Sequence, residues 1–78
     1  MVEEGKVIAV KLSADAEERV MFRTKDITER YGQKYYVFCN VKPLEEVTLA
    51  DFWAISENYF SHLKEEGMLR EIERWCDL

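Results

Sequence analysis

The sequence has few of the residues from which catalytic and metal sites are usually built. It contains one histidine, three glycines and two cysteines among 78 residues. A structural zinc site needs about four ligands, and nothing near His62 completes such a set. Three glycines do not suffice for a phosphate-binding loop, and no nucleophile motif such as G-x-S-x-G occurs. We therefore expect no catalytic residue, no metal site and no cofactor, and the protein is not expected to be an enzyme.

Long apolar runs are absent as well. No stretch approaches the roughly 20 apolar residues that a membrane-spanning helix requires, and the acidic start MVEEGK lacks the apolar core of a signal peptide. We therefore expect a cytoplasmic protein without a membrane partner. Cys39 and Cys76 lie far apart in the sequence, and we expect both to be reduced, buried thiols.

Charged residues are abundant but unevenly distributed. The chain carries 16 acidic and 11 basic residues, for a net charge of −5. Up to residue 42 there are eight basic and seven acidic residues, whereas the remainder has three and nine. This acidity argues against an indiscriminate phosphate binder, although the local field at a site matters more than the net charge. A charged fraction of 35% with few amide side chains is typical of proteins from thermophiles.

Length and periodicity predict a single domain over residues 1–78 of the α+β class. Residues 6–12, 19–27 and 34–42 alternate with the period of a strand, placing Ile8 and Val10 on one face. They predict a small antiparallel β-sheet of three or four strands within residues 6–42. From an N-cap at Thr48 to a C-terminal Gly67, the spacing of apolar residues is helical. We therefore expect a long α-helix at about 49–66, followed by a short C-terminal helix at 68–77.

The segment KYYVFCNVK, residues 34–42, carries the main functional signal. One face of this strand, with Tyr35, Val37 and Cys39, is interpreted as core, whereas the other face carries Tyr36 and Phe38 among polar residues. If residues 32 and 33 form a two-residue hairpin loop, the basic side of strand 19–27 joins the Tyr36 face.

The same register brings an acidic residue into the apolar face. It sets Asp26 opposite Cys39, which a bulge near Lys25 or Asp26 would relieve. The composite face is then the predicted nucleic-acid-binding site, and it comprises Arg19, Met21, Arg23, Lys25, Lys34, Tyr36, Phe38, Asn40 and Lys42.

Aromatic side chains interleaved with cations are typical of surfaces that bind single-stranded nucleic acid. Bases stack on the aromatic rings and the cations contact the phosphates, while an amide such as Asn40 can pair with a base edge. Two alternatives remain open. In the first, the face of Tyr36 and Phe38 is buried in the fold or in a dimer, and the protein would be an oligomeric protein–protein interaction module. In the second, the protein binds RNA and not DNA.

Residues 32–75, GQKYYVFCNVKPLEEVTLADFWAISENYFSHLKEEGMLREIERW, resemble the ThermoDBP family and its shorter relatives. These are single-stranded DNA-binding proteins of hyperthermophilic archaea. The resemblance lies in the aromatic strand, in the connection PLEEVTLADF and in LKEEG at the end of the predicted helix. It implies an antiparallel sheet with packed helices and a cleft of aromatic and basic side chains. It further implies DNA rather than RNA as the ligand and a homo-oligomer formed through helical segments or the sheet face.

Overall fold

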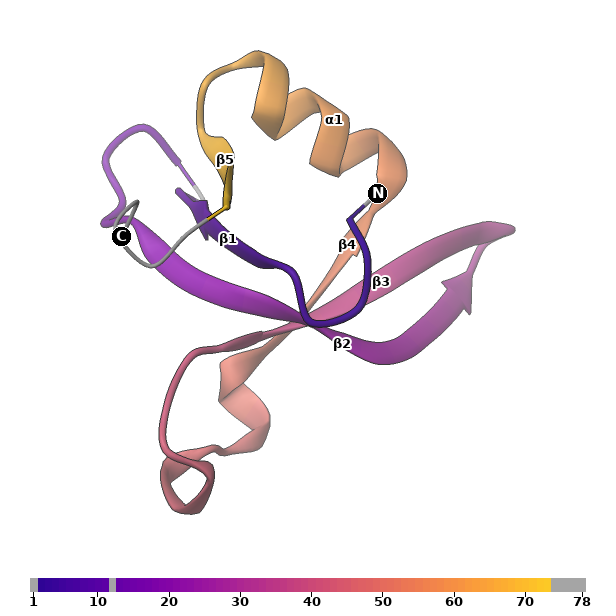
Figure 1. The fold of residues 1–78 in the computed structure, drawn as a ribbon. Coiled ribbons are helices and arrows are strands. Elements are labelled where there is room, and N and C mark those ends of the chain that lie inside the picture. The colour runs from indigo at the N-terminus through magenta and orange to yellow at the C-terminus, as the bar shows by residue number, and fades with distance from the viewer. Residues whose placement is uncertain (1, 12, 74–78) are drawn as a thin grey trace.

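The computed structural model describes residues 2–11 and 13–73, which form a five-stranded antiparallel sheet and one α-helix (Figure 1). The strands lie in the order β4-β3-β2-β1-β5, so the chain forms a meander and then returns beside β1. The expected α+β class is confirmed. The elements are β1 (Val7–Val10), β2 (Arg19–Arg30), β3 (Gln33–Asn40), the 3-10 turns η1 (Leu44–Glu46) and η2 (Leu49–Asp51), β4 (Phe52–Ser56), α1 (Glu57–Glu65) and β5 (Leu69–Ile72).

The expectation of a long helix over 49–66 is wrong. Residues 52–56 form β4, which pairs with β3, and α1 has nine residues. The apolar spacing in this segment suits a helix, but Phe52, Trp53 and Ile55 also favour a strand. Pairing with β3 decides between the two because tertiary context overrides weak helix propensity. Within the expected helix 68–77, residues 69–72 form β5, and residues 74–78, including Cys76, lie outside the described residues.

Both ends of α1 have sequence-encoded caps. The Ser56 hydroxyl accepts a hydrogen bond of 3.2 Å from the Tyr59 amide, which makes Ser56 the N-cap. At the other end, the Met68 amide donates to the Leu63 carbonyl at 2.8 Å and Gly67 has φ +74°, as in a Schellman motif. The predicted helix end at Gly67 is therefore confirmed, although the helix begins later than expected.

The β2–β3 hairpin turns at Tyr31 and Gly32, whose φ angles are both positive, at 52° and 75°. Two positive φ values are the signature of a type I′ turn, whose twist matches that of the flanking strands. The loop lies one residue earlier than expected, so Arg30 opposes Gln33. This moves the register by two residues, and an even shift keeps every side chain on its predicted face.

The expected bulge in β2 is present between Arg23 and Ile27. The Thr24 hydroxyl organises it by donating to the Val37 carbonyl at 2.9 Å and accepting from the Asp26 amide at 3.2 Å. Beyond the bulge Arg23 opposes Phe38 and Phe22 opposes Cys39. Cys39 therefore does not face Asp26, as it did in the predicted register. The prediction that Arg23 shares a face with Phe38 is therefore confirmed.

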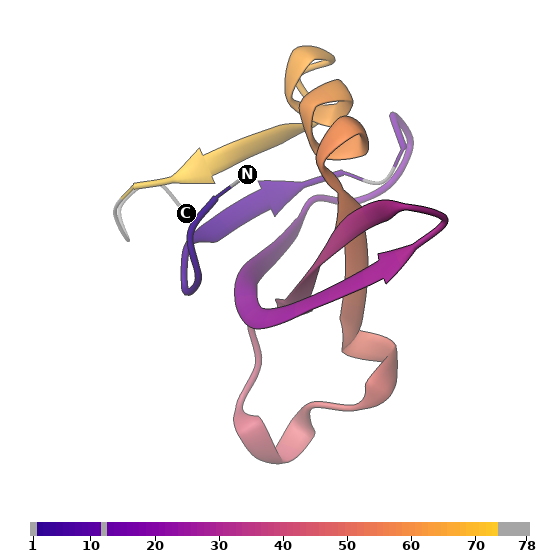
Figure 2. The same cartoon turned by 90° about the vertical axis from the view of Figure 1, so that its right-hand side faces the viewer.

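The hydrophobic core lies between α1 and the face of the sheet that carries Phe38, and α1 packs across this face (Figure 2). The ring of Phe38, with no exposed surface, stacks on Phe60 of α1 with 6.2 Å between the ring centroids. Ile8 and Val10, which were predicted to share one face of the strand, are both buried here. The cluster consists of Val2, Ile8, Val10, Met21, Phe38, Ile55, Phe60, Leu63 and Leu69.

In the described ranges, 2–11 and 13–73, no helix combines the length and apolar character needed to cross a membrane.

Candidate nucleic-acid interface

The face predicted to bind nucleic acid is the face that α1 covers. Phe38 is 0% exposed and Met21 is 1% exposed, so neither ring nor thioether is accessible to a base. The expectation of an exposed Phe38 and Met21 is therefore wrong. The alternation of β3 was interpreted correctly, but α1 packs on the Phe38 side because Phe60 and Leu63 complete the core there.

Arg23 and Tyr36 are engaged in packing on this same side of the sheet. The Arg23 guanidinium lies 4.7 Å from the centroid of the Tyr36 ring, and its Nη1 donates to the Val2 carbonyl at 3.1 Å. The Arg23 Nε is buried and has no hydrogen-bond partner among the described residues. Both side chains are half-buried, and the cation–π contact replaces the phosphate and base contacts that the sequence suggested.

Asn40 and Lys42 both contact a buried carboxylate, that of Asp51. Lys42 Nζ lies 2.8 Å from Asp51 Oδ1, and Asn40 Nδ2 donates to the same oxygen at 3.1 Å. The Thr48 amide donates to Asp51 Oδ2 at 2.8 Å, which caps η2 at the residue predicted as an N-cap. Lys42, the Thr48 amide and Asn40 together hold the pKa of Asp51 well below its usual value. These two predicted binding residues thus anchor the connection between β3 and β4.

We expect the Asp51→Asn variant to show a weaker loss of stability in acid than the wild type. Because the pKa of Asp51 is lowered by folding, its carboxylate stabilises the fold above its unfolded-state pKa of about 3.9, and this contribution is lost as the pH falls below that value. Thermal unfolding at pH 7 and pH 3 measures the difference. An equal loss in both proteins would contradict the role assigned to Asp51.

The remaining predicted residues are exposed but scattered. Arg19 opposes Val10 at the start of β2, whereas Lys25 lies in the bulge. Lys34 opposes Glu29 and borders a polar depression of about 290 Å³ at the start of α1. The nine predicted residues therefore do not form one surface, and the predicted site must be revised.

The opposite face of strands β2, β3 and β4 carries no α-helix among the described residues (Figures 1 and 2). We call it the open face. Cross-strand partners share a side of the sheet, so the register assigns its members. None of the residues that the register places on this face is acidic, and Asp26 lies in the adjoining bulge, which the register does not pair. The open face comprises Phe22, Thr28, Arg30, Gln33, Tyr35, Val37, Cys39, Phe52, Ala54 and Ser56.

Aromatic rings lie at both ends of the open face. Phe52 and Phe22 both oppose Cys39, one from each neighbouring strand, and Phe52 is 42% exposed. Between them Cys39 is a buried free thiol, and burial raises its pKa above the usual value. The expectation of a buried thiol is therefore confirmed for Cys39.

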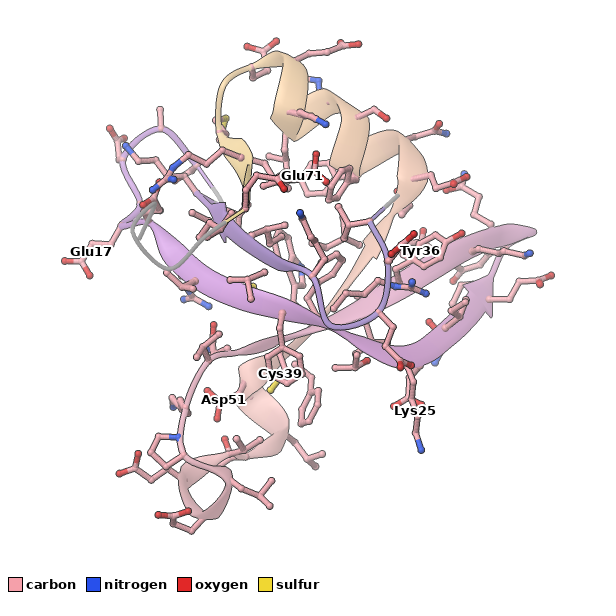
Figure 3. All side chains as sticks on the ribbon, in the orientation of Figure 1. Glu17, Lys25, Tyr36, Cys39, Asp51 and Glu71 are labelled. Carbon is pink, nitrogen blue, oxygen red and sulfur yellow. The ribbon has the colours of Figure 1, made fainter. Side chains whose placement is uncertain are left out.

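At the hairpin end, the open face is hollowed. A shallow depression of about 430 Å³ is lined mostly by apolar surface and lies between β2, β3 and β4. Tyr35 is half-buried in its floor, and Tyr31 at the turn is 98% exposed. Arg30 supplies a cation at the margin, and Lys25 projects from β2 away from α1 (Figure 3). The lining residues are Thr28, Arg30, Tyr31, Tyr35 and Ala54.

Sequence reasoning assigned Tyr35 to the core and missed Phe22, Phe52 and Arg30. Alternation separates the two faces of a strand but does not say which one the helix covers. A signal existed in β1, because Ile8 and Val10 were predicted to share one face of the strand. Ile8 opposes Met21 and Met21 opposes Asn40, so the register places the Ile8 face on the same side of the sheet as Phe38. The polar connection between β1 and β2 does not fix this register in advance.

His62, the histidine considered as a metal ligand, lies exposed on α1 with its ring 6.3 Å from that of Tyr59. In the part of the chain that the structure describes, no three His, Cys, Asp or Glu side chains are grouped so as to hold a metal ion.

Comparisons of the chain with protein-family models, with curated proteins and with solved structures gave no match. The function is therefore argued from the geometry of the open face.

Proposed function

We propose that the protein is a non-catalytic domain that binds single-stranded nucleic acid on the open face. The observation that carries this proposal is a sheet face on which the register places Phe22, Tyr35 and Phe52 and no acidic residue. Stacking of a base on an exposed aromatic ring contributes about 1–3 kcal/mol and tolerates any base. A sheet surface also lets several unstacked bases spread out side by side.

The charge distribution supports the same face. The net charge of −5 would oppose a polyanion if the acidic residues were spread evenly. Among the described residues, the register places none of them on the open face, whose charged member Arg30 borders the depression beside Tyr35. Phosphates that follow the hairpin would contact Arg30 and Lys25, while the bases would meet the rings of Tyr31 and Tyr35.

The resemblance of residues 32–75 to the ThermoDBP family favours DNA over RNA, and it stays a prediction. A competition experiment distinguishes the two ligands. We expect a DNA oligonucleotide to displace a labelled strand at a lower concentration than the RNA of the same sequence. Tighter binding of the RNA would identify RNA as the ligand and leave the open face as the site.

Two arginine variants test the proposed face against the one predicted from sequence. Arg30 lies on the open face, whereas Arg19 lies on the side that α1 covers. Each contact to a phosphate of a single strand adds about −0.7 to the slope of log affinity against log salt concentration. We expect Arg30→Gln to make the slope less negative by about that amount. Arg19→Gln removes the same charge and is expected to bind as the wild type does.

The measurement is a fluorescence anisotropy titration of a labelled single-stranded oligonucleotide at several salt concentrations. Absence of binding at low salt, or a slope that does not depend on salt, would contradict the proposed function. An effect of Arg19→Gln without one of Arg30→Gln would contradict the assignment of the face.

A further inference from the structure

The sheet has two edge strands, and they differ in how they are protected. β5 carries Arg70, which lies 3.4 Å from Glu18, and Glu71, which lies 2.9 Å from Lys64. Charged side chains on an edge oppose pairing with another chain. β4 has the sequence FWAIS, with no charge and no proline, and β3 is its one partner among the described strands. β4 therefore presents an unprotected edge.

We infer that β4 pairs antiparallel with β4 of a second copy of this chain. With a twofold axis perpendicular to the sheet through Ala54, each Ala54 opposes the other. Trp53 then opposes Ile55 of the second copy, and Phe52 opposes Ser56 of the second copy. Antiparallel partners share a side of the sheet, so within β4 apolar side chains meet apolar or small ones and no charges face each other. The contact is isologous and closes at two copies.

Exposed apolar side chains at the two ends of β4 support a second copy as the occupant. Leu49, just before β4, is 91% exposed, and Tyr59, just after it, is 40% exposed. Both lie within three residues of the strand that the second copy would pair with. One residue beyond each end of β4, the pairing brings Glu57 near Asp51 of the second copy, where Lys42 at 2.8 Å already compensates the carboxylate.

Two five-residue strands and their flanking side chains make a small interface. Stable complexes usually bury more than about 1,200 Å² in total, so we expect a reversible dimer with a dissociation constant on the order of micromolar. Because the axis is perpendicular to the sheet, both open faces lie on the same side of the dimer. If the open face binds nucleic acid as proposed, one strand would cross both copies. The dimer itself does not depend on that function.

Substitution of Ala54 tests the contact directly. Ala54 is exposed on the edge strand, and a lysine there would face a second lysine across the axis. We expect Ala54→Lys, and separately Ala54→Glu, to raise the dissociation constant of the dimer at least about tenfold, because directly opposed like charges disfavour pairing. An equimolar mixture of the two variants is expected to associate again, as a heterodimer with opposite charges on the axis. Ala14→Lys, at an exposed position in the connection before β2, is the matched control and is expected to leave dimerisation unchanged.

Sedimentation equilibrium over a range of protein concentrations, without nucleic acid, measures each dissociation constant, and thermal unfolding checks that each variant is folded. A wild-type chain that stays monomeric throughout would overturn the inference. That result is the one expected if an extended peptide, and not a second copy, occupied this edge. A dimer that Ala54→Lys leaves intact would place the contact elsewhere. Failure of the mixed variants to associate would exclude the register. None of these results depends on whether the protein binds nucleic acid.

Discussion

Replacing Phe38 with alanine is expected to lower the free energy of unfolding by about 3–5 kcal/mol. The side chain has no exposed surface, and its ring stacks on Phe60 between β3 and α1. Its removal leaves a cavity at the contact that holds the helix on the sheet. A domain of this size has a total stability of about 5–15 kcal/mol, so the variant retains a small margin or unfolds. Urea denaturation followed by circular dichroism measures the loss.

Phe52→Ala is the matched control because it removes the same side chain from the other side of the sheet. Phe52 is 42% exposed on the open face, and we expect its loss to cost less than about 1 kcal/mol, as for surface positions. Equal destabilisation by the two substitutions would mean that α1 does not cover the Phe38 face. Retention of full stability in Phe38→Ala would have the same meaning.

The second large effect concerns binding. We expect Tyr35→Ala and Phe52→Ala each to weaken the binding of single-stranded DNA by about 1–3 kcal/mol, the usual contribution of one stacked base. Tyr35 lines the depression at the hairpin end and Phe52 lies at the far end of the open face, so the two effects test separate parts of one surface. The titrations are to be carried out at protein concentrations at which the chain is monomeric, because Phe52 also lies in the proposed dimer contact.

Variants that keep the ring separate stacking from other causes. Tyr35→Phe and Phe52→Tyr retain an aromatic face, and we expect both to bind within about twofold of the wild type, because stacking does not need the hydroxyl. If Tyr35→Phe lost as much affinity as Tyr35→Ala, the phenol oxygen rather than the ring would be the contact. If Phe52→Ala bound normally while still folded, the far end of the open face would be excluded from the site.

The features that the sequence predicted correctly depend on neighbouring residues. Gly67 ends α1 because a positive φ is needed there, and the bulge contains Lys25 and Asp26, where an unbroken ladder in the predicted register would have set Asp26 opposite Cys39. The shared face of Arg23 and Phe38 follows from the alternation of two strands and an even-length loop. Each of these required only residues within one hairpin or one helix end.

The features that it did not predict depend on contacts between distant parts of the chain. The segment Phe52–Ser56 suits a helix by spacing and a strand by composition, and pairing with β3 decides for the strand. The side on which α1 packs is decided by Phe60 and Leu63 meeting Phe38 and Met21. Because α1 packs on that side, Phe38, which was predicted to bind nucleic acid, belongs to the core. Tyr35, which was predicted to belong to the core, is instead a candidate binding residue.

The central claim is that nucleic acid binds the open face and not the side that carries α1. Amide chemical-shift mapping of the 15N-labelled protein, titrated with a single-stranded oligonucleotide at low salt, tests this claim most directly. We predict the largest shifts at Phe22, Arg30, Tyr35 and Phe52, with small changes along α1 from Glu57 to Glu65. Shifts concentrated on α1, or no shifts at saturating oligonucleotide, would contradict the claim.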